Sequence, residues 1–357
     1  MSMRWSSKTA IERGIALLAL ILVAIGPFVF NDYWANEILT QTFLIGIAAA
    51  SLIFLSAYGG MVSLAQTALY GVSGFIVGNL VTTGGAGGTS KGLHLGWDPT
   101  VSILVAIALT TLIGLILGAV SARSAGIYFL MITLTYAVVA YYFFGQVTKL
   151  SGFSGIGGID RYTPFGPIVN HHDRLYYIAL VTAVLVYLLI RYVVRTPFGL
   201  TLQGVRDEPV RMSSLGYNVA LHRTLAFGFG AFLASLAGIL FVWWNGQIDP
   251  QTVGLGSTID LLVIAVIGGL VRIEGAWLGA FAFIVINTYV RDVEVPVLGG
   301  SFNTIIGLIF LAVVILSPDG LMGVWDRVTR GLLRRGRGGG SPRTEPVAEP
   351  PAAGAGA

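Results

Sequence analysis

Polar side chains recur at helical spacing within an otherwise apolar part of the chain. Ser63, Gln66, Thr67 and Tyr70 are offset by 0, 3, 4 and 7 positions, which predicts one shared face of a helix. In lipid such a face must point into the protein. It could line an aqueous path for a zwitterion, or its groups could form hydrogen bonds between packed helices. Thr133, near the middle of a later apolar segment, is a further candidate for the same path.

A charged stretch, RTPFGLTLQGVRDEPVRMSSLGYNV at 195–219, interrupts the apolar chain. Charges would lie on one side and Leu202, Val205 and Leu215 on the other, a pattern suited to binding in a groove of a partner. An ordinary basic loop that fixes the topology is the alternative. The candidate partner-contacting residues are Arg206, Asp207, Glu208, Pro209, Arg211, Leu215 and Gly216.

The same stretch carries signals for a helix start and a helix end. Pro209 suits the first turn of a helix, where its missing N–H costs nothing. Asp207 and Glu208 before it would favour that N-terminus by capping or by interaction with the helix dipole. Gly216 suits the helix end. We therefore predict a short helix near 208–215.

The sequence carries no pattern typical of an enzyme or a metal site. It has no cysteine, and none of its four histidines has a second ligand at metal spacing. The segment GAGGTSKG departs from a phosphate-binding loop, because Ser90 precedes Lys91 and Gly92 follows it. We expect no catalytic residue, no metal, no bound cofactor and no hydrolysis of ATP by this chain itself.

Ionisable residues are almost absent from the apolar segments, whereas an ion-driven carrier needs one at membrane depth. Asp260 and Glu274 lie near segment ends, where an interface position is the usual explanation. This disfavours an ion-coupled secondary transporter but not a non-transporting membrane scaffold. If the chain transports a solute, the energy must come from a partner.

Helices in a membrane must position these residues. Hydrophobic residues make up 55% of the 357 and charged residues 11%, whereas soluble domains are about a quarter charged. We predict an all-α polytopic membrane protein with a transmembrane domain at 1–330 and a disordered tail at 331–357. The ten predicted spans lie near 14–30, 38–58, 63–82, 100–121, 125–145, 175–194, 223–244, 258–271, 275–290 and 301–317.

Basic residues indicate the orientation of these spans. With the N-terminus in the cytoplasm, 16 of the 21 Lys and Arg residues fall in cytoplasmic segments, as the positive-inside rule requires. Both termini are therefore predicted to be cytoplasmic. The short segments 258–271 and 275–290 could be a tight helical pair or one broken element buried by protein.

Several segments, in order along the chain, resemble motifs of the permease subunits of branched-chain amino acid ABC transporters, in particular the M-type subunit. Besides the charged stretch described above, they are YGGMVSLAQTALYGVSGF (58–75), SAGIYFLMITLTYAVV (124–139), LSGFSGIGGI (150–159), DLLVIAVIGGLVRIEGAWLGA (260–280) and LSPDGLMG (316–323).

The resemblance implies a subunit of an importer in the inner membrane of a bacterium. A second permease of the H type would pair with it, two cytoplasmic ATP-binding subunits would drive it, and an extracytoplasmic binding protein would deliver Leu, Ile or Val. It implies no nucleic-acid partner. The charged stretch would then contact the ATPases. The glycine-rich outer loop with Gly152, Ser154 and Gly155 could dock the binding protein, or serve as a simple linker.

Some residues depart from the family pattern. Gln66 stands where the family commonly has His, Phe153 and no Asn occupy the outer loop, and Met212 to Ser214 replace a stretch often richer in Ala and Glu. These departures concern the substrate more than the class of transporter. Urea, another small amino acid or amide and, more distantly, a sugar therefore stay open as substrates.

Overall fold

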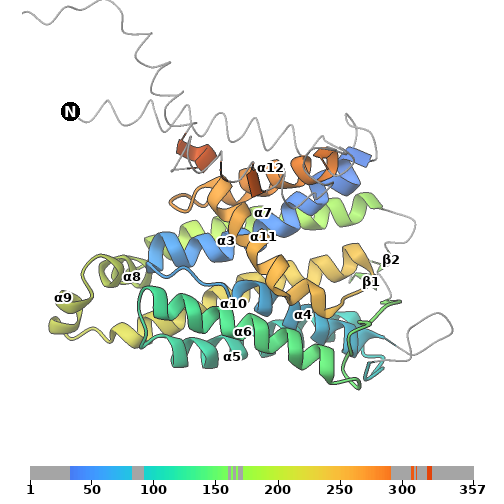
Figure 1. Cartoon of the computed structure of the whole chain (residues 1–357), viewed down its shortest axis with the longest axis horizontal. Coiled ribbons are helices and arrows are strands. Elements are labelled where there is room, and N and C mark those ends of the chain that lie inside the picture. Colours follow the sequence, from blue (N-terminus) through green and yellow to red (C-terminus); the bar gives the residue numbers. More distant parts are fainter. Residues whose placement is uncertain are drawn as a thin grey trace, which may run out of the picture.

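The structure is a computed structural model. It describes residues 33–82, 92–159, 162–163, 166–167, 172–290, 307–308, 311 and 320–323. This part of the chain is almost entirely helical (Figure 1), which confirms the all-α class. The predicted first span at 14–30 and the tail at 331–357 lie outside the described residues, as does most of the last predicted span.

Each of the eight apolar segments predicted between 38 and 290 is helical over most of its length. In chain order the elements are the π-helix η1 (Trp34–Leu39), α3 (Thr40–Gly59), α4 (Gln66–Val81), α5 (Pro99–Ser121), α6 (Ile127–Gln146), the two-residue strands β1 (Tyr162–Thr163) and β2 (Gly166–Pro167), α7 (His172–Arg195), α8 (Pro197–Asp207), α9 (Pro209–Ser214), α10 (Val219–Asn245), the 3-10 helix η2 (Pro250–Val253), α11 (Leu255–Gly268) and α12 (Gly275–Val290).

Length and composition mark the membrane helices. Within the described residues, five helices are long and apolar enough to cross a bilayer, namely Glu37–Gly59, Pro99–Ser121, Ile127–Gln146, Arg174–Arg195 and Val219–Asn245. Two shorter apolar helices, Leu255–Gly268 and Gly275–Tyr289, follow. The glycine pair before Arg272 separates these two helices, so the 258–290 region is a helical pair and not one continuous span.

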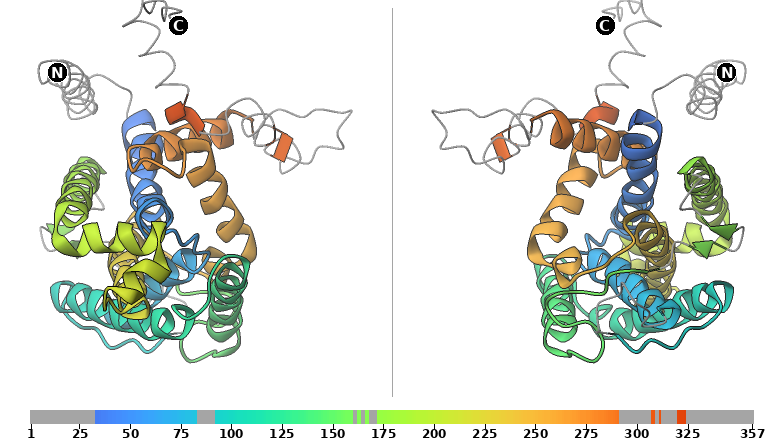
Figure 2. Two further views of the ribbon diagram at one scale, coloured as in Figure 1. Left: turned by 90° about the vertical axis from the view of Figure 1, so that its left-hand side faces the viewer. Right: turned by 90° about the vertical axis from the view of Figure 1, so that its right-hand side faces the viewer.

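Two helices form the centre of the bundle. In the most apolar 18-residue stretches of α3 and α10, 83% and 72% of the residues are buried, compared with 22–28% in those of α5, α6 and α7. Figure 2 shows α5, α6 and α7 around the outside of α3, α4 and α10. The exposed Leu, Ile and Val side chains of the outer helices would face lipid, because lipid tails solvate them as well as a protein core does.

Small residues bring α4 and α10 into close contact. A Cβ on Gly238 of α10 would lie 1.9 Å from the carbonyl oxygen of Tyr70 on α4. Beside it, the Ser73 hydroxyl lies 2.8 Å from the carbonyl oxygen of Tyr70 and 3.1 Å from that of Ser235. The lack of a side chain at Gly238 therefore sets the spacing of the two helices.

The two ends of the bundle differ in charge. Helices α8 and α9 lie at one end and strands β1 and β2 at the other (Figure 1). Of the Lys and Arg residues in the described ranges, those near the α8–α9 end are Arg123, Arg191, Arg195, Arg206, Arg211, Arg223 and Arg272, and those near the β1–β2 end are Lys149 and Arg174. The positive-inside rule associates such an excess with the cytoplasmic side.

Candidate functional site

A cavity of about 1210 Å³ lies between α3, α4, α6, α10, α11 and α12. Hydroxyl, amide and carboxylate groups contribute a substantial part of its lining. The polar lining residues are Thr67, Tyr70, Tyr141, Tyr142, Asn245, Asp249, Gln251, Thr252, Ser257, Asp260 and Asn287. A membrane protein keeps polar groups in its interior mainly where they form bonds or meet water and solutes.

Most polar lining residues lie toward one end of the cavity, whereas Thr67 and Tyr70 of α4 lie further in. The end toward β1 and β2 receives Asn245 at the end of α10, the η2 segment, and Asn287 in the last turn of α12. The deeper part is lined by aliphatic and aromatic side chains, namely Ile45, Ala48, Val263, Ile264 and Phe283. The cavity thus combines a mainly polar mouth with a mainly apolar interior.

Two of the predicted path residues line this cavity. Thr67 is 4% exposed, and its hydroxyl has no hydrogen-bond partner among the described residues. Tyr70 lies one turn further along α4, and its ring centroid is 5.4 Å from that of Phe241. Both residues are therefore placed where a solute in the cavity would meet them.

Ser63 and Thr133 are predicted path residues that lie outside the cavity lining. Helix α4 begins at Gln66, so Ser63 precedes it, and the predicted common helical face for Ser63 and Tyr70 is wrong. The Ser63 hydroxyl accepts the N–H of Ala65 at 3.3 Å. Thr133 Oγ1 accepts the N–H of Leu64 at 3.1 Å, from a residue 69 positions earlier. Both hydroxyls satisfy backbone groups at the turn before α4.

Gln66 also packs between helices and does not line the cavity. Its side chain is fully buried, and its amide oxygen accepts the Ser51 hydroxyl of α3 at 3.1 Å. The amide nitrogen has no partner among the described residues, and it lies close to Gly230 of α10. Gln66 therefore joins α3 to α4 at the centre of the bundle.

Sequence reasoning missed the polar residues between α10 and α11. Asp249 caps η2, because its carboxylate accepts the N–H of Thr252 at 3.1 Å. Helix α11 begins at Leu255, three residues before the predicted span. Asp260 consequently lies in the second turn of an apolar helix, still near the end of its segment as expected, and it lines the cavity. The NGQIDPQ turn (245–251) was the available signal for a capped connection.

The charged stretch 195–219 forms two helices: α9 (Pro209–Ser214) lies where the short helix near 208–215 was predicted, and α8 (Pro197–Asp207) precedes it and was not predicted. Thr196 caps α8 by accepting the N–H of Gly199 at 3.4 Å, and Pro197 occupies its first turn. The break falls at Glu208, whose φ of −143° and ψ of 73° are not helical. A residue before proline is pushed out of the α region, which explains why α8 ends just before Pro209.

Helix α9 has the start and end that were predicted. Pro209 occupies its first turn. Gly216 has a φ of 90°, the N–H of Tyr217 donates to Met212 O at 3.1 Å, and the N–H of Gly216 donates to Ser213 O at 3.0 Å. These two bonds form a Schellman motif, which needs a residue with positive φ at the position of Gly216.

The predicted cap from Asp207 or Glu208 is not formed. Glu208 makes no side-chain capping bond. Asp207 accepts a hydrogen bond of 2.7 Å from Arg206 instead, and this bond lowers the pKa of the Asp207 carboxyl below its ordinary value. The acidic pair therefore leaves the N–H groups of α9 free of side-chain caps.

The apolar side chains of the charged stretch divide into two groups. Leu202 and Val205 of α8 are fully buried against the bundle. Val210 and Leu215 are 77% and 66% exposed, and no residue of α9 is buried. Helix α8 thus anchors the stretch, while α9 presents apolar and basic groups at the surface. The predicted single apolar face is wrong, because Leu215 does not share it with Leu202.

Arg206 ties α8 to the end of α3. Its guanidinium donates a hydrogen bond to the carbonyl oxygen of Ala57, in the last turn of α3. Its side chain also lies over Gly60, where a Cβ would come within 2.6 Å of Arg206 Cγ. A cation at this helix end interacts favourably with the helix dipole. A movement of α8 would therefore be passed to the central helix.

The outer loop at 150–159 is held in place. Ile156 and Ile248 exchange backbone hydrogen bonds of 2.8 and 2.9 Å. Gly155 has a φ of 73°, and a Cβ there would lie 2.5 Å from Ile248 O. These contacts tie the loop to the segment that follows α10. Of the three predicted docking residues, Ser154 is exposed, while Gly152 and Gly155 are buried.

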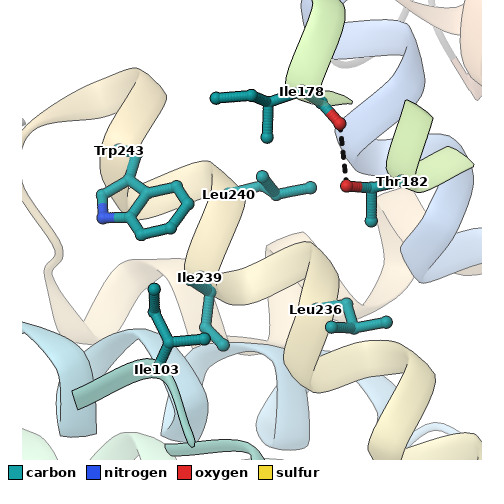
Figure 3. A pocket seen from close by; sticks show the side chains of 7 residues that line it. All are labelled: Ile103, Ile178, Thr182, Leu236, Ile239, Leu240 and Trp243. Atoms are coloured by element: carbon teal, nitrogen blue, oxygen red, sulfur yellow. Dashed lines mark hydrogen bonds between the residues drawn. The ribbon is translucent and has the colours of Figure 1, made fainter. Parts of the chain in front are cut away.

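A second pocket of about 210 Å³ lies between α5, α7 and α10 (Figure 3). Its walls are mainly aliphatic, and the Thr182 hydroxyl is satisfied by Ile178 O at 2.7 Å. No charged side chain is among the residues that line this pocket. Among the described residues, no group of three or more His, Asp or Glu could hold a metal ion.

The amino-acid sequence of this chain is similar to those of known proteins over most of its length. A family model described as branched-chain amino acid transport system / permease component matches residues 35–317. The high-affinity branched-chain amino acid transport system permease protein LivM of Salmonella typhimurium is 23% identical over 345 residues, which cover 88% of this chain and 76% of the relative.

Relatives with other named substrates also match. The fructose import permease protein FrcC of Rhizobium meliloti is 24% identical over 274 residues, 74% of this chain and 71% of the relative. The autoinducer 2 import system permease protein LsrC of Klebsiella pneumoniae is 34% identical over 131 residues, 34% of this chain and 37% of the relative. No solved structure matches the chain. Since the family model covers well over half of the chain, this polytopic membrane protein belongs to the family of permease components of branched-chain amino acid transport systems.

Proposed function

We propose that the chain is a permease subunit of an ATP-driven importer that moves branched-chain amino acids into the cytoplasm. The observation that carries this proposal is the cavity of about 1210 Å³ with its polar mouth and apolar interior. An amino acid with a branched aliphatic side chain has the same division into a charged end and an apolar end.

The apolar interior favours an aliphatic side chain over a sugar. Ile264 and Phe283 of the interior offer no hydrogen bonds, and burying a Leu, Ile or Val side chain contributes roughly 1.5–3 kcal/mol. A sugar would leave hydroxyl groups without partners there, which is unfavourable. Urea or another small amide has no aliphatic side chain to bury against this interior. These two classes are therefore the alternatives to exclude.

The charge distribution supports an orientation. We infer that the α8–α9 end is cytoplasmic, because it carries seven of the nine Lys and Arg residues in the described ranges. The polar mouth then faces the outside of an inner membrane, where a binding protein would deliver the substrate. If the ten predicted spans cross the membrane in alternating directions, both termini lie in the cytoplasm as well.

Helix α9 supports the contact with ATP-binding subunits. It presents Val210 and Leu215 to the surface beside Arg211, while α8 and Arg206 connect it to α3. Two ATP-binding subunits would bind here and on a second permease of the H type. Exposed Ser154 lies at the opposite end of the bundle, where the binding protein would dock.

Transport by the reconstituted assembly tests the substrate. The chain, a sister permease, the ATP-binding subunits and the binding protein are placed in liposomes, and ATP-dependent uptake of labelled leucine, isoleucine, valine, fructose and urea is measured. We expect uptake of the three amino acids only. Uptake of fructose or urea without leucine uptake would overturn the proposed substrate class.

Variants of α9 test the coupling role. Arg211→Glu, Glu208→Lys and Val210→Asp should lower substrate-stimulated ATP hydrolysis about tenfold or more. Arg195→Ala, an exposed arginine at the end of α7, is the control and should leave hydrolysis unchanged. Normal assembly together with normal stimulated hydrolysis in the α9 variants would rule out a coupling role.

A further inference from the structure

Asp260 is an unpaired carboxylate in the lining of the cavity. It lies in the second turn of α11, an apolar helix, and its side chain is exposed to the cavity. It makes no ion pair or hydrogen bond with the rest of the described chain. A carboxylate among apolar helices is costly unless it meets a counter-ion, so it is by default a functional group.

Asp249, the other carboxylate of the lining, already has partners. It accepts the N–H of Thr252 at 3.1 Å and the hydroxyl of the same residue at 3.3 Å, and so caps η2. None of the described lining residues is Lys, Arg or His. The charged groups of this lining are therefore negative, and the cavity favours a cationic group on a solute.

We propose that Asp260 binds the ammonium group of the transported amino acid, an assignment that rests on the proposed function. Hydrogen bonds between an ammonium and a carboxylate are among the stronger polar contacts in proteins. The hydroxyls of Tyr141 and Tyr142 and the amide of Asn287 supply donors for the substrate carboxylate at the polar mouth. The aliphatic side chain would point toward Ile264, one turn deeper along α11.

This assignment makes the ammonium group a requirement for transport. Fructose and urea lack a cationic group, so neither compensates the charge of Asp260. Negative charge on the protein and a positive group on the solute thus select for amino acids over fructose, the sugar named in the relative FrcC. The selection acts in the membrane and is separate from that of the binding protein.

Uptake kinetics of the reconstituted complex test the assignment. Asp260→Asn removes the charge at constant shape, and we expect the KM for leucine uptake to rise about tenfold or more. Asp260→Glu keeps the charge, and its KM should lie close to that of the wild type. Asp98→Asn is the matched control. Asp98 caps α5 outside the cavity through Thr100 N–H at 2.9 Å, and Asn caps equally well. An unchanged KM in an assembled Asp260→Asn complex would overturn the assignment.

Thiol labelling tests the same charge without any substrate. The chain has no cysteine, so Ser257→Cys, one turn before Asp260, can be modified alone. The rate ratio of an ammonium-bearing to a sulfonate-bearing methanethiosulfonate should be several-fold higher at Ser257→Cys than at exposed Ser154→Cys. An equal ratio at the two positions would overturn the assignment. Failure of the wild-type complex to import any amino acid would instead overturn the proposed function.

Discussion

Arg191 Nη2 lies 3.0 Å from Glu274 Oε1 and thereby joins the end of α7 to the turn between α11 and α12. The Tyr187 hydroxyl donates to the same carboxylate oxygen at 2.9 Å and accepts from Arg191 Nε at 3.0 Å. The three side chains hold α11 and α12 against α7 at the α8–α9 end. The polar mouth of the cavity lies at the opposite end of the same two helices.

Glu274→Gln should cause only a small loss of stability. The two charged side chains are 47% and 37% exposed, and pairs this accessible contribute roughly 0.2–1 kcal/mol. We expect a decrease in Tm of at most about 4 °C for the detergent-solubilised protein. The exchange Arg191→Glu with Glu274→Arg should recover much of this loss. A double variant no more stable than the sum of its single changes would show that the pair is not coupled.

Arg206→Ala should separate α8 from the central helix. The change removes the hydrogen bond to Ala57 O and the packing on Gly60, for a loss of about 1–2 kcal/mol. Substrate-stimulated ATP hydrolysis should fall, while binding of the ATPase subunits to α9 should persist, as measured by co-purification. If stimulated hydrolysis matches that of Arg195→Ala, then α8 does not transmit movement to α3.

Gly238→Ala should disrupt the packing of α4 against α10. The new Cβ would lie 1.9 Å from Tyr70 O, which is backbone and cannot rotate away. Overpacking of this kind typically destabilises by about 1–3 kcal/mol. The yield of monodisperse protein and its Tm are the measurements. Gly256→Ala is the control, because no atom lies within 4 Å of a Cβ there. Equal Tm values for the two variants would contradict the close contact.

Thr133→Val and Thr67→Val should have opposite consequences. Without its hydroxyl, residue 133 leaves the buried N–H of Leu64 unpaired, at about 1–3 kcal/mol. Its Tm should fall while the KM for leucine stays the same. Thr67 lines the cavity and its hydroxyl has no described partner, so its loss should change the KM with little effect on Tm. A changed KM for Thr133→Val, together with an unchanged KM for Thr67→Val, would show that the substrate path does not run through the cavity.

The sequence was sufficient to locate the helices but not their junctions. Apolar length located α3 to α7 and α10 to α12, and Pro209 and Gly216 correctly marked the two ends of α9. The break at Glu208 was also readable, since a residue before proline leaves the α region. The start of α4 was not, because Thr133 supplies the hydrogen bond that holds the turn from 69 residues away.

The candidate site was predictable only in part for the same reason. Thr67 and Tyr70 have helical spacing and do line the cavity. Gln66 has the same spacing, but the Ser51 hydroxyl of α3 takes up its amide oxygen. Asp260 was not identified, because its position depends on where α11 begins and on which helices surround it. Contacts between distant segments, and not local pattern, decide which polar groups face the cavity.

Thiol accessibility tests most directly whether this cavity carries the substrate. Thr67→Cys, Ser63→Cys and Thr133→Cys can each be made in a chain without cysteine. In the reconstituted complex, a water-soluble thiol reagent should modify Thr67→Cys, leucine delivered by the binding protein should slow that modification, and modification should block uptake. The cysteines at 63 and 133 should stay unmodified. Modification at 63 or 133 with none at 67, or modification at 67 that leaves leucine uptake intact, would contradict the proposed path.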